Sequence, residues 1–274
     1  MAHNFRRQSC RRQDCRRYGL PPYATVLIHG GPGAGGEMAP VARELAPHFG
    51  VLEPIQTAVT LEGQVEELRQ VLEKEALPPV TLVGYSWGAW LGWITTARFP
   101  ALVRRLVMVS SGPFAERDVA QLAETRRQRL TPLENEEFAA LLQALADPAA
   151  KGKDALLARL GALAAKTDSF DPLQDEENDD STGPRGDIFH AVWNEAAAMR
   201  RSGALLELAQ DIHCPVSAIH GDYDPHPAQG VFAPLAARLE QFNFHLLEHC
   251  GHTPWKECLA RERFYDILIE EISR

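Results

Sequence analysis

Short apolar runs alternate with amphipathic stretches over the first 110 residues of the chain. Runs typical of buried β-strands occur at residues 24–28, 51–55, 80–85 and 105–110. The stretches between them carry apolar side chains at helical spacing, most clearly at Leu61, Val65, Leu68 and Leu72. Strands that alternate with helices in this way predict a parallel sheet with helices on both faces.

The alternation stops at Gly112-Pro113 and resumes near residue 215. Residues 114–210 are helical in pattern, without a convincing strand. After them come a strand at 215–219, a helix at 227–240, a strand at 242–248 and a helix at 255–272. We therefore expect one α/β core, formed by residues 21–113 and 211–274, into which an all-helical cap of residues 114–210 is inserted.

Composition narrows the class of protein. The 274 residues are 45% hydrophobic and carry a net charge of −9, so a large core is feasible and nonspecific nucleic-acid binding is not expected. No apolar run approaches the ~20 residues of a membrane span, and no signal peptide is apparent. The five cysteines are irregularly spaced, which argues against a disulfide framework and favours the cytoplasm. Oligomeric state is not indicated.

The N-terminus differs from the rest of the chain. Residues 1–17 contain six arginines and one acid, Asp14. We expect residues 1–20 to form a disordered basic arm. An arm that binds an acidic partner or serves in targeting is the alternative.

The segment Gly84-Tyr85-Ser86-Trp87-Gly88 follows the apolar run at 80–83 and precedes a helix-like stretch at 89–99. A serine between two glycines on a strand-to-helix turn is typical of a nucleophile elbow. The turn leaves no room for flanking side chains, and it exposes the serine hydroxyl at the top of the sheet. Ser86 is therefore the candidate nucleophile.

A serine hydroxyl needs a base to accept its proton, and the base needs an acid to orient it. In a fold of this kind the partners follow the serine in the order acid, then histidine, on loops after strands. Asp222 and Asp224 both follow the strand at 215–219, and His249 and His252 both follow the strand at 242–248.

With these motifs, residues 20–272 resemble the α/β-hydrolase superfamily. Its Gly-x-x-Asp and Gly-His patterns select Asp224 and His252 over their neighbours. The resemblance also implies an oxyanion hole formed by two backbone N–H groups, for which Gly31, on the loop after the first strand, and Trp87 are the candidates.

The segment His29-Gly30-Gly31-Pro32-Gly33, together with Gly-x-Ser-Trp-Gly, is similar to the proline iminopeptidase branch of this superfamily. That similarity implies a serine aminopeptidase in which cap carboxylates bind the free ammonium of the substrate. Glu195, in Trp193-Asn194-Glu195, is the candidate amine anchor. Tyr85, at a position where that branch usually has glycine, is the second candidate substrate-binding residue.

We therefore expect a cofactor-free serine hydrolase that cleaves a small molecule or short peptide through an acyl-enzyme. A carboxylesterase is the alternative within the class, and a non-catalytic small-molecule-binding protein of the same fold is the alternative outside it. The string His220, Asp222, Asp224, His226 also permits a metal site. Because no second ligand cluster with zinc spacing exists, we favour a catalytic acid within a solvated loop and expect no metal.

Overall fold

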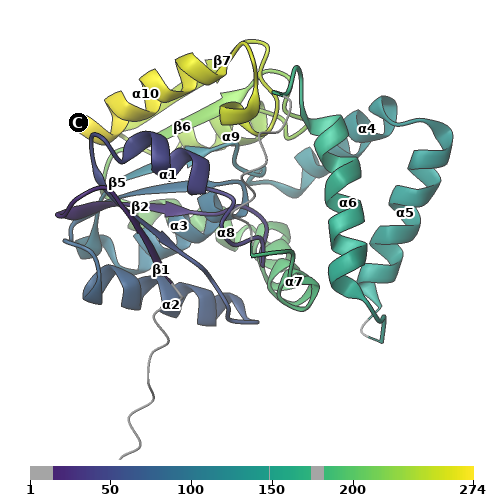
Figure 1. Cartoon of the computed structure of the whole chain (residues 1–274), viewed down its shortest axis with the longest axis horizontal. Helices are drawn as coiled ribbons and strands as arrows, with labels where there is room; N and C mark the ends of the chain where they lie inside the picture. Colours follow the sequence, from purple (N-terminus) through teal and green to yellow (C-terminus); the bar gives the residue numbers. More distant parts are fainter. Residues whose placement is uncertain (1–14, 148, 174–181) are drawn as a thin grey trace, which may run out of the picture.

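The computed structural model describes residues 15–147, 149–173 and 182–274. Over these residues a seven-stranded sheet, ordered β1-β3-β2-β4-β5-β6-β7, forms the centre of the molecule (Figure 1). The strands are β1 (Cys15–Tyr18), β2 (Tyr23–Ile28), β3 (Gly50–Pro54), β4 (Val80–Tyr85), β5 (Val103–Val109), β6 (Val216–Gly221) and β7 (Phe242–Leu247). Only β1 runs antiparallel to its neighbour, so the sheet is mostly parallel, as predicted.

Helices cover both faces of the sheet. They include α1 (Ala39–Leu45), α2 (Leu61–Lys74), α3 (Trp87–Arg98), α9 (Gln229–Ala236) and α10 (Arg261–Ser273). One buried cluster joins α2, α3 and α9 to the sheet, and a second joins α1 and α10 to its other face. The two clusters sandwich fully buried strands such as β4, in agreement with the near-continuous apolar runs of a parallel sheet.

Residues 114–210 contain helices and no named strand where the structure describes them. The helices are α4 (Val119–Arg129), α5 (Pro132–Ala146), α6 (Lys153–Asp168), α7 (Gly186–Ser202) and α8 (Ala204–Glu207), with 3-10 turns at Glu116–Asp118 and Leu208–Asp211. In Figure 1, α4, α5 and α6 project from the core as a separate lobe, which we call the cap lobe.

The predicted cap of residues 114–210 therefore combines two kinds of structure. The cap lobe has its own small cluster of five leucines, Leu130, Leu141, Leu145, Leu160 and Leu163. In contrast, α7 and α8 contribute Ile188, Val192, Ala196 and Leu205 to the main core cluster. The Trp93 indole on α3 also donates a hydrogen bond to the Leu205 carbonyl oxygen at 2.8 Å.

The prediction of a disordered arm over residues 1–20 is wrong for residues 15–18, which form β1 against β3. Polar contacts explain this strand. Glu53 on β3 accepts a hydrogen bond from the Tyr18 hydroxyl at 2.8 Å and lies 3.6 Å from Arg16, while Arg17 pairs with Glu75. Residues 1–14 lie outside the described residues. None of the described helices is long and apolar enough to cross a membrane.

Candidate active site

Backbone contacts explain why glycine flanks Ser86. A Cβ atom on Gly84 would lie 2.2 Å from the Gly88 carbonyl oxygen, and one on Gly88 would lie 2.3 Å from the Ile28 carbonyl oxygen. Ser86 itself has a φ of 51°, a strained value for a residue with a side chain. The start of α3 therefore packs closely against the end of β2, and Ser86 remains partly exposed.

Three side chains from distant parts of the chain meet at this elbow. His252 Nε2 lies 3.1 Å from Ser86 Oγ, and His252 Nδ1 lies 2.8 Å from Asp224 Oδ2. Asp224 follows β6 and His252 follows β7, so the parallel strands bring both loops to the same edge of the sheet. The arrangement has the contacts of a nucleophile, a base and an orienting acid.

Asp222 and His249 occupy different positions. Asp222 Oδ1 accepts a hydrogen bond from the Cys250 backbone N–H at 3.1 Å, which joins the two loops. The His249 ring lies against Phe170, 5.1 Å between centroids. The structure thus places Asp224 and His252, rather than Asp222 and His249, in contact with each other.

Asp224 is buried among three imidazoles, those of His220, His226 and His252. Burial alone would raise the pKa of this carboxyl, but the three histidines hold it well below its ordinary value. For His252, burial disfavours the charged form, and Asp224 outweighs it, so the pKa of the imidazole is raised. The pair is therefore arranged to stabilise an imidazolium.

His226 is the main correction to the sequence-based interpretation of this loop. We expected a solvated segment around Asp224, yet His226 is buried and its Nδ1 lies 2.8 Å from Asp224 Oδ1. Its ring stacks on that of His252 at 4.3 Å between centroids. The sequence did indicate this contact, because His226 lies only two residues after Asp224. The interpretation of this segment as a solvated loop did not use that proximity.

Asp224, His226 and His252 place potential metal-ligand atoms within 4.8 Å of one another. Each Nδ1 faces a carboxylate oxygen that can only accept, so each carries a proton that a metal would have to displace. The described contacts are thus those of a hydrogen-bonded network.

Backbone from the cap lobe contacts the His252 loop directly. The His252 N–H donates to the Asp168 carbonyl oxygen at 2.7 Å. A Cβ atom on Gly251 would lie 2.1 Å from that same oxygen, which explains the glycine before the histidine. The buried carboxylate of Glu257 accepts from the N–H groups of Gly251, Phe170 and Asp171 and holds the two segments together.

The cap lobe also brings a buried ion pair close to the site. Arg126 on α4 binds Asp168 at the end of α6 through two contacts of 2.9 and 2.5 Å. Asp168 raises the pKa of His252 and Arg126 lowers it. Nothing in the sequence pattern pointed to this pair, because its members lie 42 positions apart within the cap.

The two candidate oxyanion-hole residues lie on different elements, Gly31 in the loop after β2 and Trp87 at the start of α3. Gly31 has a φ of 34°, a conformation that glycine adopts readily. Trp87 is the first residue of α3, where backbone N–H groups lack partners within the helix. Its indole is buried in the core and donates a hydrogen bond to Gln64 Oε1 at 3.1 Å.

The two candidate substrate-binding side chains have structural contacts. The Tyr85 hydroxyl lies 2.9 Å from Thr253 Oγ1, and its buried ring contacts Trp255 and His252, so it packs beneath the His252 loop. Glu195 on α7 accepts a hydrogen bond from the Leu61 N–H at the start of α2, at 3.0 Å. Neither contact supports the expected role in binding substrate.

Glu37 is a further acid beside the site. Its Oε2 lies 2.7 Å from the position that a Cβ atom on Gly30 would take, next to the Tyr85 ring. Burial raises the pKa of this carboxyl, although the charge of His252 opposes the shift. The residue lies just before α1, and no sequence motif pointed to it.

Comparisons with known proteins bear on the family and the fold of the chain. The sequence profile of the alpha/beta hydrolase family matches residues 25–266. None of the curated proteins matches the chain.

Three solved structures illustrate the range of proteins with a similar fold. A putative lipase from Acinetobacter baumannii AYE is 18% identical, with a TM-score of 0.66 and coverage of 94% of this chain and 88% of that one. A serine hydrolase involved in carbazole degradation is 19% identical, with a TM-score of 0.61 and coverage of 94% and 93%. A proline iminopeptidase from Mycobacterium smegmatis is 18% identical, with a TM-score of 0.59 and coverage of 94% and 93%.

At such identities the structures show the fold alone, whereas the family profile spans most of the chain. The predicted superfamily and fold are thus confirmed: the chain belongs to the alpha/beta hydrolase family.

Proposed function

We propose that the protein is a serine hydrolase that cleaves a small amide or ester through an acyl-enzyme. The observation that carries the proposal is the pair of contacts made by His252, at 3.1 Å to Ser86 Oγ and at 2.8 Å to Asp224 Oδ2. These distances suit transfer of the serine proton to Nε2 while Nδ1 stays hydrogen-bonded to the acid.

In the proposed reaction, Ser86 Oγ attacks the substrate carbonyl carbon as His252 Nε2 takes its proton. The N–H groups of Gly31 and Trp87 stabilise the oxyanion of the tetrahedral intermediate. His252 then protonates the leaving group as its bond to carbon breaks. Water, deprotonated by His252, then attacks the acyl carbon. The bond from that carbon to Ser86 Oγ breaks as His252 Nε2 returns the proton to Oγ, which releases the acid product and restores Ser86.

The contacts of Ser86, Asp224 and His252 do not distinguish amide from ester substrates, so the choice between them rests on other features. An aminopeptidase of proline iminopeptidase type is favoured by the residues 29–33 and by a solved neighbour of that activity. A carboxylesterase is the alternative, since other neighbours are described as a putative lipase and a serine hydrolase. The predicted cytoplasmic location stays a prediction.

A labelling experiment combined with a substrate panel tests the proposal. We expect a fluorophosphonate probe to modify Ser86, located by mass spectrometry of the labelled peptide, and to abolish turnover of amino-acid arylamides or short acyl esters. Labelling without turnover of any panel member would favour the non-catalytic binding protein. The absence of both would contradict the serine mechanism itself.

Glu195→Ala separates the two roles available to Glu195. If the residue binds the substrate ammonium, KM should rise for amino-acid arylamides and stay unchanged for esters. If it serves only the start of α2, both substrates should respond equally, and unfolding should occur at a lower temperature. We expect the second result, because its carboxylate already accepts the Leu61 N–H.

A further inference from the structure

We infer that His226 is a positioning residue for the proposed reaction: it shares the Asp224 carboxylate with His252 and so limits how tightly that carboxylate retains a proton on the base. The inference rests on the proposed function. It adds a fourth side chain to the three that the sequence motifs identify.

Each oxygen of the Asp224 carboxylate contacts the ring of a different histidine. Oδ2 lies 2.8 Å from His252 Nδ1. Oδ1 lies 2.8 Å from His226 Nδ1 and also accepts the His226 backbone N–H at 2.9 Å. Because both oxygens are engaged, the carboxylate has one orientation in which it satisfies both rings.

His226 is itself held in place. Its carbonyl oxygen lies 2.8 Å from His220 Nε2, and its ring stacks on His252 with an interplanar angle of 23°. Burial lowers the pKa of His226 to about 4, although Asp224 opposes the shift. The imidazole is therefore a neutral donor at neutral pH, with its Nδ1 proton directed at the carboxylate.

A second donor weakens the hold of Asp224 on His252. Each hydrogen bond to a carboxylate stabilises its negative charge, and a stabilised charge attracts a neighbouring imidazolium less. Removal of the His226 donor should therefore raise the pKa of His252. A base that retains its proton to higher pH can accept the proton of Ser86 over a narrower pH range.

Other charged and titratable groups face this pair, and all remain in the variants below. Asp168 and Arg126 approach from the cap lobe, and His220 lies on β6. Tyr85 and Glu37 approach from β4 and the loop before α1. Their influence is common to every protein compared, so a difference between variants reports the side chain at position 226.

Three substitutions separate the donor from the ring. His226→Asn places an amide N–H near the former Nδ1, His226→Gln places its amide near the former Nε2, and His226→Phe keeps a ring without a donor. The measurement is the acid limb of kcat/KM against pH, which reports the base in the free enzyme.

We expect His226→Phe and His226→Gln to move the acid limb to higher pH by up to about one unit, and His226→Asn to restore most of the wild-type profile. Below the limb, one unit corresponds to a roughly tenfold loss of rate. Equal profiles for all three variants, whether shifted or not, would overturn the inference.

A second measurement keeps the test independent of turnover. Titration of the His252 imidazole by NMR, in the Ser86→Ala protein with and without each substitution, should show the same order of pKa values. If the wild type neither turns over substrate nor reacts with the probe, the proposed function fails by itself. If it does both while His252 titrates identically in all variants, only the inference about His226 fails.

Discussion

The elbow region and the cap lobe are specified by different kinds of contact. Around Ser86, a Cβ atom on either flanking glycine would overlap a backbone oxygen at 2.2–2.3 Å. In the cap lobe, an added Cβ atom on Gly161 meets nothing within 4 Å. A region built from backbone contacts accepts few sequences, whereas one built from leucine packing accepts many.

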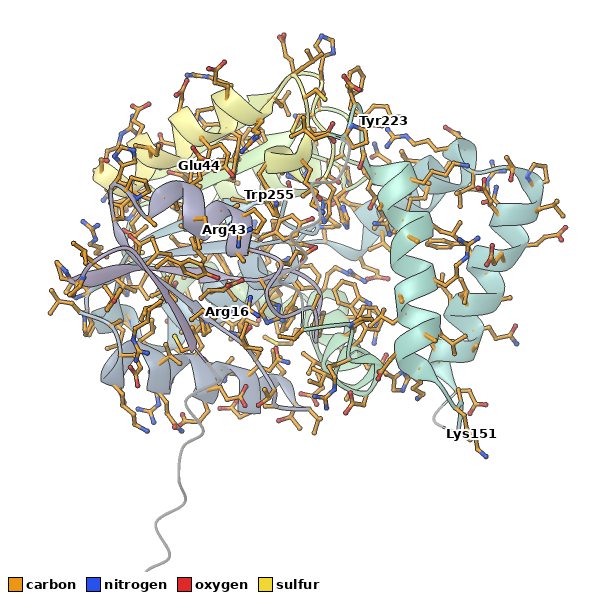
Figure 2. All side chains as sticks on the ribbon, viewed as in Figure 1. Arg16, Arg43, Glu44, Lys151, Tyr223 and Trp255 are labelled. Atoms are coloured by element: carbon orange, nitrogen blue, oxygen red, sulfur yellow. The ribbon has the colours of Figure 1, made fainter. Side chains whose placement is uncertain are left out.

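The two regions meet at a junction of charged side chains. Arg129 on α4 donates to the carbonyl oxygens of Thr167 and Tyr223, and its guanidinium lies 3.5 Å from the centre of the Tyr223 ring. Figure 2 shows Tyr223 where the cap helices approach the core. Arg129 thus attaches the cap lobe to the loop that carries Asp224.

The largest effect should come from the nucleophile. Ser86→Ala removes the Oγ atom that His252 Nε2 faces, and we expect kcat to fall about 10⁴-fold or more. The measurement is turnover of the best panel substrate, with the unfolding temperature as the control for folding. A stable variant with more than a tenth of wild-type activity would contradict the role of Ser86 as nucleophile, since the reaction would then not depend on the elbow.

Gly88→Ala should give the next largest effect. Its new Cβ would lie 2.3 Å from the Ile28 carbonyl oxygen, so α3 must move away from β2. We expect the free energy of unfolding to fall by more than about 3 kcal/mol, measured by denaturant unfolding. Wild-type stability in this variant would show that the elbow is less constrained than its contacts indicate.

The junction should respond more moderately. Arg126→Met leaves the buried Asp168 with its hydrogen bond from Thr167 but without its ion-pair partner. Because a fifth of the Arg126 side chain is exposed, we expect the free energy of unfolding, measured by denaturant unfolding, to fall by about 2 kcal/mol. Since Arg126 lowers the pKa of His252, its removal should also move the acid limb of kcat/KM to higher pH.

The adjacent residue supplies a matched control. Arg127 makes an equivalent two-contact pair with Glu124 on the same helix, but both side chains are exposed. Arg127→Met should therefore leave both the free energy of unfolding and the pH profile close to those of the wild type. Similar behaviour of the two variants would argue that the cap lobe does not reach the site electrostatically.

The smallest effect should come from within the cap lobe, and it should have the opposite sign. Gly161 is an exposed residue inside α6, and an added Cβ meets no atom within 4 Å. Gly161→Ala should therefore raise the free energy of unfolding by about 0.5–1 kcal/mol, with activity unaffected. A loss of stability in this variant would show that the cap lobe, like the elbow, does not tolerate an added side-chain atom.

Sequence patterns a few residues long were sufficient to predict the core strands and the candidate catalytic residues. Apolar periodicity located the strands of the core to within about two residues, because the central strands are buried on both faces and therefore form near-continuous apolar runs. Chain order and loop position narrowed the partners of Ser86 to two aspartates and two histidines, and the patterns of the family that the chain resembles selected Asp224 and His252.

The rest depended on contacts between distant residues. Strand β1 forms because Glu53 and Glu75 pair with its arginines, which composition alone presented as a disordered arm. Similarly, α7 has the same helical periodicity as the cap lobe, yet Val192 and Ala196 pack against the main core. Periodicity predicts that a face is buried and does not identify the surface that covers it.

The hydrogen bond from the His252 N–H to the Asp168 carbonyl oxygen has a consequence for protein engineering. A chimera that receives its cap from another member of the family would exchange the cap helices together with the main-chain segment that contacts the His252 loop. Grafts that end before residue 167 should keep the native support for His252. Grafts that extend past it should need a donor whose backbone follows the same path beside Gly251.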